Sequence, residues 1–387
     1  MPDRIYLDWN ATTPLRPEAR AAMAAAMEIS GNPSSVHAEG RQARRLMEDA
    51  REAVARAVGA VPRNVVFTSG GTEANALALS PGLRAAAGPV ARLLLSAIEH
   101  PSVLSGGQFA HDALQTIPVT PSGVVDLEQL RRLLAEGPPA LVSVMAANNE
   151  TGALQPISEV AGIVHAAGSL LHVDAIQALG KIPFHIKEVD ADLATVSAHK
   201  IGGPKGVGAL ILGARIEGLA PLLRGGGQER GRRAGTENII GITGFGAAVT
   251  AAMAALDVDR PRLQGLRDRL EAGLRAAGGA QVFSADVPRL PNTTLFTASG
   301  LKAETAVIGF DLEGIAVSSG SACSSGKVQA SHVLQAMGVG SSAAQGAVRL
   351  SLGWSTQEAD IDRAIEAWRK LSRTLIKGSD ETVLERF

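Results

Sequence analysis

The chain has 387 residues, among them 37 Lys and Arg against 38 Asp and Glu, so its formal net charge is −1. This length predicts two or three domains, and the balanced charge excludes nucleic acid and membrane surfaces as main partners, because neither would be attracted over a distance. Apolar residues make up 45% and charged residues 19% of the chain, which excludes an intrinsically disordered protein.

The first predicted elements are two helices, over Pro17–Ile29 and His37–Val58. From about Val65 to Gly213, short apolar and β-branched runs alternate with helical stretches, which is the pattern of a parallel sheet covered by helices. We therefore expect an α/β fold with one mainly parallel, seven-stranded sheet. Its predicted strands are Val65–Thr68, Leu93–Ser96, Thr116–Val119, Leu141–Val144, Leu170–Val173, Ala194–Ser197 and Ala209–Leu212.

An uncharged run covers the 18 residues from Ile239 to Leu256. It is long enough to span a membrane, but Ala, Gly and Thr dominate it, so we expect a helix packed inside the protein that ends near Leu256. The charged segment Asp257–Arg262 follows and predicts a domain boundary. Beyond it, the order helix, strands, helix, strand, helix predicts a smaller α+β domain.

A glycine-rich segment, Thr68–Asn75, lies between the first predicted strand and a helix. Backbone N–H groups at a helix N-terminus, with Gly71 and the Thr72 hydroxyl, suit an anion such as a phosphate. The segment lacks the Gly-Lys-Ser/Thr ending of a nucleotide P-loop and the glycine spacing of a dinucleotide fold. By itself it is equally consistent with an ordinary turn capped by Thr72.

Polar side chains follow two later strands: Asp174 and Gln177 after one, and Ser197, His199 and Lys200 after the next. Ligands of open α/β sheets bind at the carboxyl ends of the strands. A buried acid is stable opposite a cation such as a pyridinium nitrogen, and a desolvated lysine can form a Schiff base. Taken singly, Asp174 is equally consistent with a helix cap, and most lysines lie on the surface.

His100 and Asn149 occupy the corresponding places after two other strands. A histidine there can stack on a flat cofactor or move protons, whereas the alternative for His100 is a plain helix-start residue. The alternative for Asn149, within Asn-Asn-Glu-Thr-Gly, is an ordinary turn.

Together these motifs resemble the cysteine desulfurases, pyridoxal-phosphate enzymes of the class V aminotransferase superfamily. The likeness rests on the segments around Thr72, Asp174 and Lys200, and it runs from Tyr6-Leu7-Asp8 to Val348-Arg349-Leu350-Ser351. It implies a fold-type I enzyme with a large cofactor-binding domain over residues 16–257. The small domain would combine residues 1–15 with 258–387 and carry the catalytic cysteine.

The resemblance also implies a role for each residue. Lys200 would hold pyridoxal 5′-phosphate through a Schiff base, and Asp174 would keep its ring nitrogen protonated, which makes the ring an electron sink. His100 would stack on the ring, and Gln177 would bond its oxygen. The remaining cofactor-binding residues, most of them at the phosphate, would be Gly71, Thr72, Asn149, Ser197, His199 and Thr236.

Two further residues are placed by the same resemblance. Arg349 would bind the substrate carboxylate through two parallel hydrogen bonds, with Asn149 near the same group. Thr236 ends the segment Gly225–Thr236, which in the resembling family reaches the phosphate of the neighbouring subunit's cofactor and therefore implies a homodimer. Read without the family, the close arginines of this segment suit anion binding or a solvated loop equally.

Cys323 is the protein's only cysteine, so neither an intrachain disulfide nor a multi-cysteine metal site can form, and no resident metal is expected. Its neighbours over Ser318–Gly326 are only Ser, Ala and Gly, whereas structural cysteines have apolar surroundings, which favours a reactive thiol. In the resembling family this loop carries the nucleophile that accepts sulfur. L-Cysteine would leave as L-alanine, and Cys323 would carry the sulfur as a persulfide.

The loop length resembles the group that passes sulfur to iron–sulfur scaffold proteins, although Lys327–Ala330 departs from that group's usual residues. The acceptor is equally consistent with a nitrogenase-dedicated scaffold or a thiolation pathway. Two alternatives stay open: a selenocysteine lyase or aminotransferase on the same scaffold, and a non-catalytic sulfur-relay or scaffold subunit. Charges near the N-terminus interrupt the apolar run that a signal peptide needs, so we expect a cytoplasmic protein.

Overall fold

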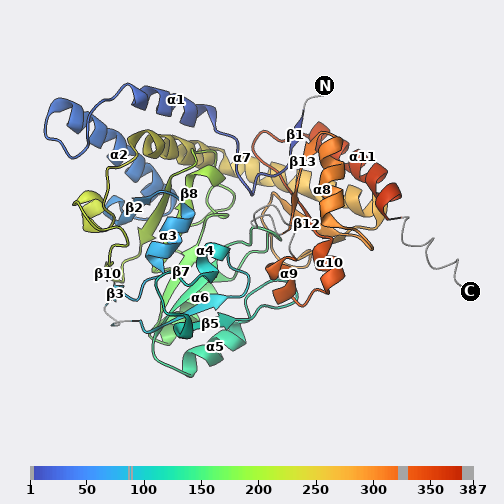
Figure 1. Cartoon of the computed structure of the whole chain (residues 1–387), viewed down its shortest axis with the longest axis horizontal. Helices are drawn as coiled ribbons and strands as arrows, with labels where there is room; N and C mark the ends of the chain where they lie inside the picture. Colours follow the sequence, from blue (N-terminus) through green and yellow to red (C-terminus); the bar gives the residue numbers. More distant parts are fainter. Residues whose placement is uncertain (1–3, 86–87, 89, 321–329, 377–387) are drawn as a thin grey trace, which may run out of the picture.

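The structure is a computed structural model of the chain, and it describes residues 4–85, 88, 90–320 and 330–376. Its largest element is a seven-stranded sheet in the order β2-β9-β8-β7-β6-β4-β5 (Figure 1). The strands are β2 (Val65–Thr68), β4 (Arg92–Ser96), β5 (Leu114–Ile117), β6 (Ala140–Met145), β7 (Leu170–Asp174), β8 (Leu193–Ser197) and β9 (Gly208–Leu212). Only β9 is antiparallel to its neighbours in this sheet, so the predicted mainly parallel α/β sheet is confirmed.

Both faces of this sheet are covered, because alternate side chains of a strand enter different cores. In β2, Val65 and Phe67 belong to one hydrophobic core and Val66 to the other. The period of two in side-chain direction produces this division, and burial on both faces explains why the strands read as continuous apolar runs. Helices along this part are α1 (Pro17–Met27), α2 (Ala38–Ala57), α3 (Gly71–Ala78), α4 (Pro101–Leu104), α5 (Leu127–Ala135) and α6 (Ile157–Ala166).

The edge strand β5 differs from its prediction by two residues, since it covers Leu114–Ile117 and not Thr116–Val119. Pro118 has no backbone N–H and cannot donate to a strand ladder, so the strand ends just before it. Gln115 and Thr116 in the middle of β5 are exposed, and this weakens the apolar pattern that marks the inner strands.

Helix α7 (Ile239–Gly278) is longer than predicted. The expectation that it ends near Leu256 is wrong, because the helix continues through the charged segment and includes Pro261. Arg262 bonds Asp259 one turn earlier at 2.9 Å, so the charged residues support the helix and do not end it. Among the described residues α7 is the one helix long and apolar enough to cross a membrane, yet it packs against α1 and α2 and contributes Phe245 to the core (Figure 1).

The C-terminal part is built on a four-stranded antiparallel sheet, β11-β12-β15-β14, which matches the predicted smaller α+β unit. Trp368 of α11 packs edge-on against Phe296 of β12 in its core, with ring centroids 4.9 Å apart. The N-terminal strand β1 (Ile5–Tyr6) pairs with β13 (Ile315–Ala316) of this part. The other elements are β11 (Gln281–Val282), β12 (Thr293–Thr297), β14 (Ser318–Ser319), β15 (Val348–Ser351), α8 (Ala303–Leu312), α9 (His332–Ala336), α10 (Ser341–Gln345), α11 (Glu358–Leu375), β3 (Arg84–Ala85) and β10 (Ile216–Gly218).

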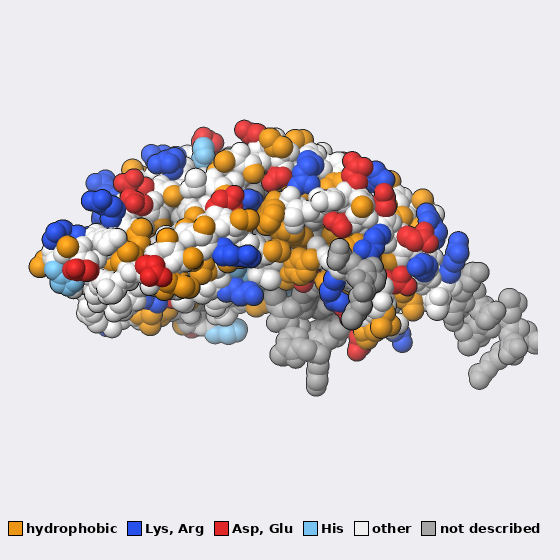
Figure 2. Space-filling view, turned by 90° about the horizontal axis from the view of Figure 1, so that it is seen from above, with side chains coloured by type: hydrophobic (Ala, Val, Ile, Leu, Met, Phe, Trp, Pro, Cys, Tyr) orange, Lys and Arg blue, Asp and Glu red, His pale blue; other side chains and the backbone are white. Residues whose placement is uncertain are grey.

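Positive and negative side chains are interspersed over the face shown in Figure 2. The division into domains at residues 15/16 and 257/258 stays a prediction. Helix α7 crosses the second of these positions without a break.

Candidate functional site

Five strands end at the same edge of the seven-stranded sheet, because β2, β4, β6, β7 and β8 run in one direction. The residues that follow them line a cavity of about 290 Å³, which we call the strand-end pocket. It contains every site residue predicted from the sequence except Thr236 and Cys323. The lining residues are Asn10, Ala11, Gly71, Thr72, His100, Ser102, Met145, Ala147, Asn149, Asp174, Ile176, Gln177, Ser197, His199, Lys200 and Arg349.

The turn between β2 and α3 forms one wall of this pocket. Gly70 has a φ of +156°, and a Cβ on Gly208 of β9 would lie 2.6 Å from the Gly70 carbonyl carbon, so this close approach of two backbones requires glycine. Helix α3 then begins with Gly71 and Thr72 at the pocket. Its first N–H groups favour an anion there.

The end of β8 adds polar groups to the pocket. Ser197 Oγ is buried and has no hydrogen-bond partner within the part of the chain that the structure describes. A buried hydroxyl without a partner costs free energy, which indicates that a ligand bonds it. Two residues later, His199 Nδ1 lies 3.2 Å from Thr12 Oγ1, and burial, helped by the charge of Lys200, lowers the pKa of His199 to about 4. At pH 7 His199 is therefore a neutral hydrogen-bonding group.

Asp174, the last residue of β7, is a buried acid at the pocket. Its carboxylate accepts hydrogen bonds of 3.0 Å from Asn75 Nδ2 and from the backbone N–H of Ile176. Burial raises the pKa of Asp174, and these two bonds oppose the rise only in part. A cation beside this carboxylate would favour its charged form.

His100 lies just after β4, at the start of α4. Its Nδ1 accepts the backbone N–H of Ser102 at 3.1 Å and lies 2.8 Å from the Ser102 hydroxyl. Because a backbone N–H can only donate, Nδ1 is the acceptor and the ring proton of neutral His100 is on Nε2. Burial lowers the pKa of His100, which favours this neutral form.

Lys200 follows β8 in a short 3-10 turn, Ala198–Lys200. Its Nζ donates to the backbone carbonyl oxygens of Asn10 at 2.6 Å and of Ala11 at 2.8 Å. The amine is thus held at the pocket wall by the N-terminal segment, which carries Asn10 between the two sheets. This contact explains how residues so early in the chain come to line a pocket at the strand ends.

Arg349, on β15, closes the pocket from the four-stranded sheet and is 2% exposed. Its Nη2 donates to Asp8 Oδ1 at 2.7 Å, and its Nη1 donates to the Asn149 carbonyl oxygen at 3.0 Å. The buried Nε has no partner among the described residues. The buried Nε–H is therefore available as a donor for an anionic ligand, and Asn149 lies beside the guanidinium.

Three polar residues of the site escaped sequence analysis. Asn10 is 1% exposed and joins the pocket to the four-stranded sheet, since its Nδ2 donates to Thr293 Oγ1 at 2.9 Å. Asn75 bonds Asp174 from α3, and Lys181 reaches the Asn10 side chain from the turn after β7. The only signal in the sequence was position: Asn75 ends the glycine-rich segment Thr68–Asn75, and Lys181 follows Gln177 by four residues. Nothing in the sequence shows that these side chains are buried at the site.

Cys323 lies outside the described residues. Gly320 and Ser331, on either side of residues 321–329, both lie close to the same acid, Glu150. Ser331 Oγ donates to Glu150 Oε2 at 2.5 Å, and a Cβ at Gly320 would lie 3.3 Å from the same oxygen. Burial raises the pKa of Glu150 to about 7, although the Ser331 bond and the charge of Arg349 lower it.

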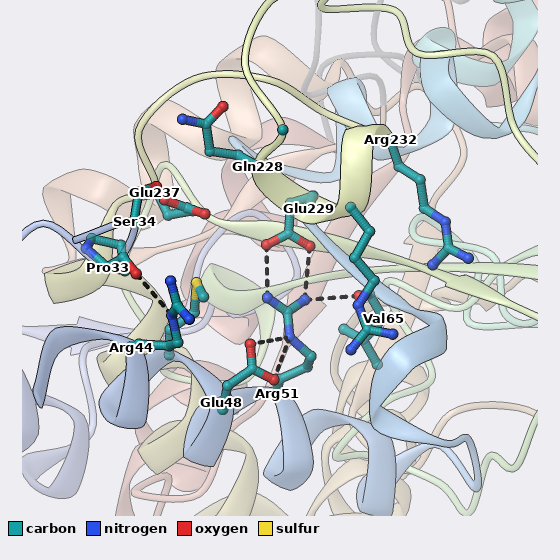
Figure 3. A pocket seen from close by; sticks show the side chains of 13 residues that line it. Pro33, Ser34, Arg44, Glu48, Arg51, Val65, Gln228, Glu229, Arg232 and Glu237 are labelled. Atoms are coloured by element: carbon teal, nitrogen blue, oxygen red, sulfur yellow. Dashed lines mark hydrogen bonds and ion pairs between the residues drawn. The ribbon is translucent and has the colours of Figure 1, made fainter. Parts of the chain in front are cut away.

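Thr236 is exposed and does not line this chain's own strand-end pocket. It follows a loop that is anchored in a second cavity of about 420 Å³, which we call the arginine pocket (Figure 3). There Arg51 of α2 forms a two-pronged ion pair with Glu229, at 2.7 and 2.8 Å. Glu229 also accepts the backbone N–H of Phe67 at 3.1 Å.

The backbone of this loop is strained. Glu229 and Arg230 have φ values of +47° and +60°, in the left-handed region that residues other than glycine seldom adopt. Arg233 in the same loop bonds Glu73 of α3 at 2.9 Å. These contacts fix the loop before Thr236 to both β2 and the helix that begins at the strand-end pocket.

The described residues contain no group of three or more His, Cys, Asp and Glu side chains placed to hold a metal ion.

Comparisons with known proteins agree over nearly the whole chain. A family model described as aminotransferase class-V matches residues 5–364. A cysteine desulfurase of Cereibacter sphaeroides is 45% identical over 94% of both chains. A NifS-like protein of Rickettsia africae has a solved structure with a TM-score of 0.88 and 38% identity over 96% of this chain and 99% of that one. A solved structure described as SspA in complex with cysteine has a TM-score of 0.75 and 29% identity over 90% and 98%.

Proposed function

This chain belongs to the class-V aminotransferase family and is a cysteine desulfurase, and from this premise we propose that its strand-end pocket binds pyridoxal 5′-phosphate beside Lys200. The observation that carries the proposal is a buried acid, Asp174, whose pKa burial raises, lining the same cavity as the amine of Lys200. A pyridinium nitrogen is the cation that such an acid would pair with. When bound, this cofactor supplies an electron sink for the carbanion formed from the substrate.

The polar groups of the pocket fit the rest of the cofactor. Ser197 Oγ lacks a partner and α3 begins beside it, so a phosphate would receive hydroxyl and N–H donors there. Thr72 and His199 line the same cavity and would add two more contacts. Gln177 and His100 would bind the ring, since a neutral imidazole can lie against a ring without adding charge.

Arg349 and Asn149 would bind the substrate. A guanidinium with an unpartnered buried N–H suits an amino-acid carboxylate, which also compensates the donor's lost hydration. One similar structure is described as a complex with cysteine, and this supports cysteine as the ligand. The His100 ring would be neutral at neutral pH, and its Nε2–H would donate to a substrate group.

Lys200 would carry the proton of the substrate's α-carbon. Its amine is held by the carbonyl oxygens of Asn10 and Ala11, which accept its N–H bonds and leave the nitrogen at the pocket wall. An amine held in this position can act as a general base for that proton.

Cys323 would accept the sulfur. Its thiolate attacks the substrate sulfur, the new S–S bond forms, and the C–S bond breaks with its electron pair left on the three-carbon fragment. Protonation of that fragment releases L-alanine, and Cys323 holds the sulfur as a persulfide. An acceptor thiol then takes the sulfur by exchange.

The protein would act as a cytoplasmic homodimer. Thr236 is exposed and absent from its own chain's pocket, so a second copy is the source of the phosphate contact that the family resemblance implies. The acceptor would be an iron–sulfur scaffold or another sulfur-accepting protein. Selenocysteine has the same carboxylate and amine, and the strand-end pocket would bind it as well.

The test is to incubate the purified protein with L-cysteine and to measure alanine, sulfide and protein-bound persulfide together. We expect equal amounts of alanine and of sulfide plus persulfide, with a reductant-labile sulfur on Cys323. Cys323→Ser should still change the cofactor's visible spectrum on addition of cysteine, yet form almost no alanine, because a hydroxyl is a far weaker nucleophile toward sulfur. Alanine formation by this variant at the wild-type rate would overturn the assigned role of Cys323.

A further inference from the structure

A second lysine lies behind the strand-end pocket. Lys181 is 8% exposed and belongs to the turn that follows β7, four residues after Gln177. Its Nζ donates to Asn10 Oδ1 at 3.0 Å and to Gln177 Oε1. Lys181 does not line the cavity, so none of the roles assigned above uses it.

These contacts determine the orientation of the Gln177 amide. The Asn10 backbone oxygen can only accept, and it receives Gln177 Nε2–H at 3.0 Å, so the amide nitrogen lies on that side. The amide oxygen then faces Lys181, whose Nζ donates to it. Both contacts therefore fit the same one of the two amide orientations. The second N–H of Gln177 is left for a ligand in the pocket that Gln177 lines.

The position of Lys181 is costly. Its pKa falls well below that of an exposed lysine because it is buried, and the positive charges of Lys200 and Arg349 lower it further. An apolar side chain would fill this place without that cost. The amine is therefore best explained by what it does to its two amide neighbours, Gln177 and Asn10.

We propose that Lys181 is a positioning residue that holds the side-chain oxygen of Gln177, so that Gln177 presents an N–H donor to the bound cofactor. The proposal rests on the proposed function, because it assumes that the strand-end pocket takes pyridoxal 5′-phosphate. It assigns Lys181 no contact with cofactor or substrate. Without Lys181, the Gln177 amide can rotate and offer its oxygen to the pocket.

The experiment measures the cofactor's visible absorbance as a function of pH in the loaded enzyme. Lys181→Met removes the donor while keeping a long side chain. Loss of one hydrogen bond to a charged ligand group corresponds to roughly one pH unit, so we expect the midpoint of the absorbance change to rise by about that much. Lys205→Met is the matched control: Lys205 is an exposed lysine whose charge also reaches the site, at His199, and its loss should leave the midpoint within about 0.3 unit.

A double-mutant cycle with Gln177→Met separates orientation from charge. If Lys181 acts through Gln177, Lys181→Met should shift the midpoint in the wild-type background and cause no further shift in Gln177→Met. An equal shift in both backgrounds would overturn the proposal and assign the effect to the lysine charge alone. An unchanged midpoint in Lys181→Met would overturn it as well.

Failure of the proposed function has a different signature. A wild-type protein that takes up no pyridoxal 5′-phosphate, with no visible band, would refute the cofactor site itself. A wild-type band that titrates normally, together with a Lys181→Met band that titrates identically, would refute only the role of Lys181. Thermal unfolding of each variant checks that the shift does not come from a loss of folded protein.

Discussion

The arginine pocket and the strand-end pocket both bury charged side chains, but they satisfy them differently. In the arginine pocket, Arg51 and Glu229 are paired through two hydrogen bonds of 2.7 and 2.8 Å, and backbone groups of β2 complete the set (Figure 3). In the strand-end pocket, the carboxylate of Asp174 is bonded by an amide and a backbone N–H. Behind that pocket, the amine of Lys181 is bonded to two amide oxygens.

The difference separates charges that hold the fold from charges that serve a ligand. The two members of a buried ion pair compensate each other's charge, and removing one member leaves the other without that compensation. A buried charge bonded only to neutral groups is costly, and burial shifts the pKa of both Asp174 and Lys181 toward the neutral form. Changes in the arginine pocket should therefore cost stability, and changes in the strand-end pocket should cost activity.

Lys200→Ala should have the largest effect of these variants, and the effect should be on activity alone. The variant loses both the attachment point of the cofactor and the base, so alanine formation should fall by about 10⁴-fold or more. The free energy of unfolding should change by less than about 2 kcal/mol, because Lys200 is only partly buried. Initial rates and urea unfolding of the same preparation measure the two quantities, and turnover near the wild-type value would remove Lys200 from its role.

Glu229→Gln should give the opposite result. It removes the buried counter-charge of Arg51 and leaves only Glu48, a part-exposed acid 3.2 Å from Arg51 Nε. The loss of the buried pair should cost about 3 kcal/mol of unfolding free energy. Glu136→Gln is the matched control, because Glu136 pairs with Arg132 at 3.0 Å on the surface and an exposed pair contributes less than about 1 kcal/mol. Equal losses in the two variants, measured by urea unfolding, would contradict the distinction between the pockets.

Asp174→Asn tests the same distinction within one kind of side chain. Loss of the carboxylate should lower the rate of alanine formation about 10²–10³-fold, while stability stays the same or rises. The control is Asp192→Asn, since Asp192 is 0% exposed but bonds Arg215 at 3.1 Å and lies just before β8, at the other edge of the sheet. That variant should lose stability and keep its rate per folded molecule; a reversed pattern in the two variants would break the comparison.

The sheet and most of the strand-end pocket were predictable because both depend on local patterns. Apolar runs mark the inner strands, and a parallel sheet brings the residues after its strands to one edge, so Asp174 and His100 meet although 74 positions separate them. The misplaced end of α7 has the same origin. Charged residues and Pro261 are local signals of a helix end, and the packing of α7 against α11 overrides them.

The contacts that the sequence did not reveal are long-range ones. Asn10 bonds Lys200 across 190 positions, and Arg51 meets Glu229 across 178. Neither pairing follows from residue type or spacing, because each depends on how two separate segments pack. Lys181 combines both cases: its distance of four residues from Gln177 was visible, but its burial behind the pocket was not.

Glu150 shares features of both kinds of buried charge, because it accepts a hydrogen bond from a neutral hydroxyl and is also acted on by the charge of Arg349. Its substitution should have the smallest effect among these variants. It is 3% exposed and receives the Ser331 hydroxyl, and burial raises its pKa to about 7, whereas an exposed glutamate titrates near 4.5. The folded protein therefore binds more protons at this site than the unfolded chain between these two values. The stabilisation of the folded protein by protonated Glu150 is complete below about pH 4.5 and is lost as the pH rises through 7.

Glu150→Gln isolates this contribution, because the amide stays neutral at every pH and can still accept the Ser331 hydroxyl. From pH 5 to pH 8, the unfolding free energy of the wild type should fall by about 2 to 3 kcal/mol more than that of the variant. Glu128→Gln, at an exposed carboxylate on α5, should follow the wild-type curve. If the wild type and Glu150→Gln changed in parallel across this range, Glu150 would be ionised in the folded protein. The charge of Arg349, which lowers the pKa of Glu150, would then compensate it, and Glu150 would belong with the paired charges of the arginine pocket.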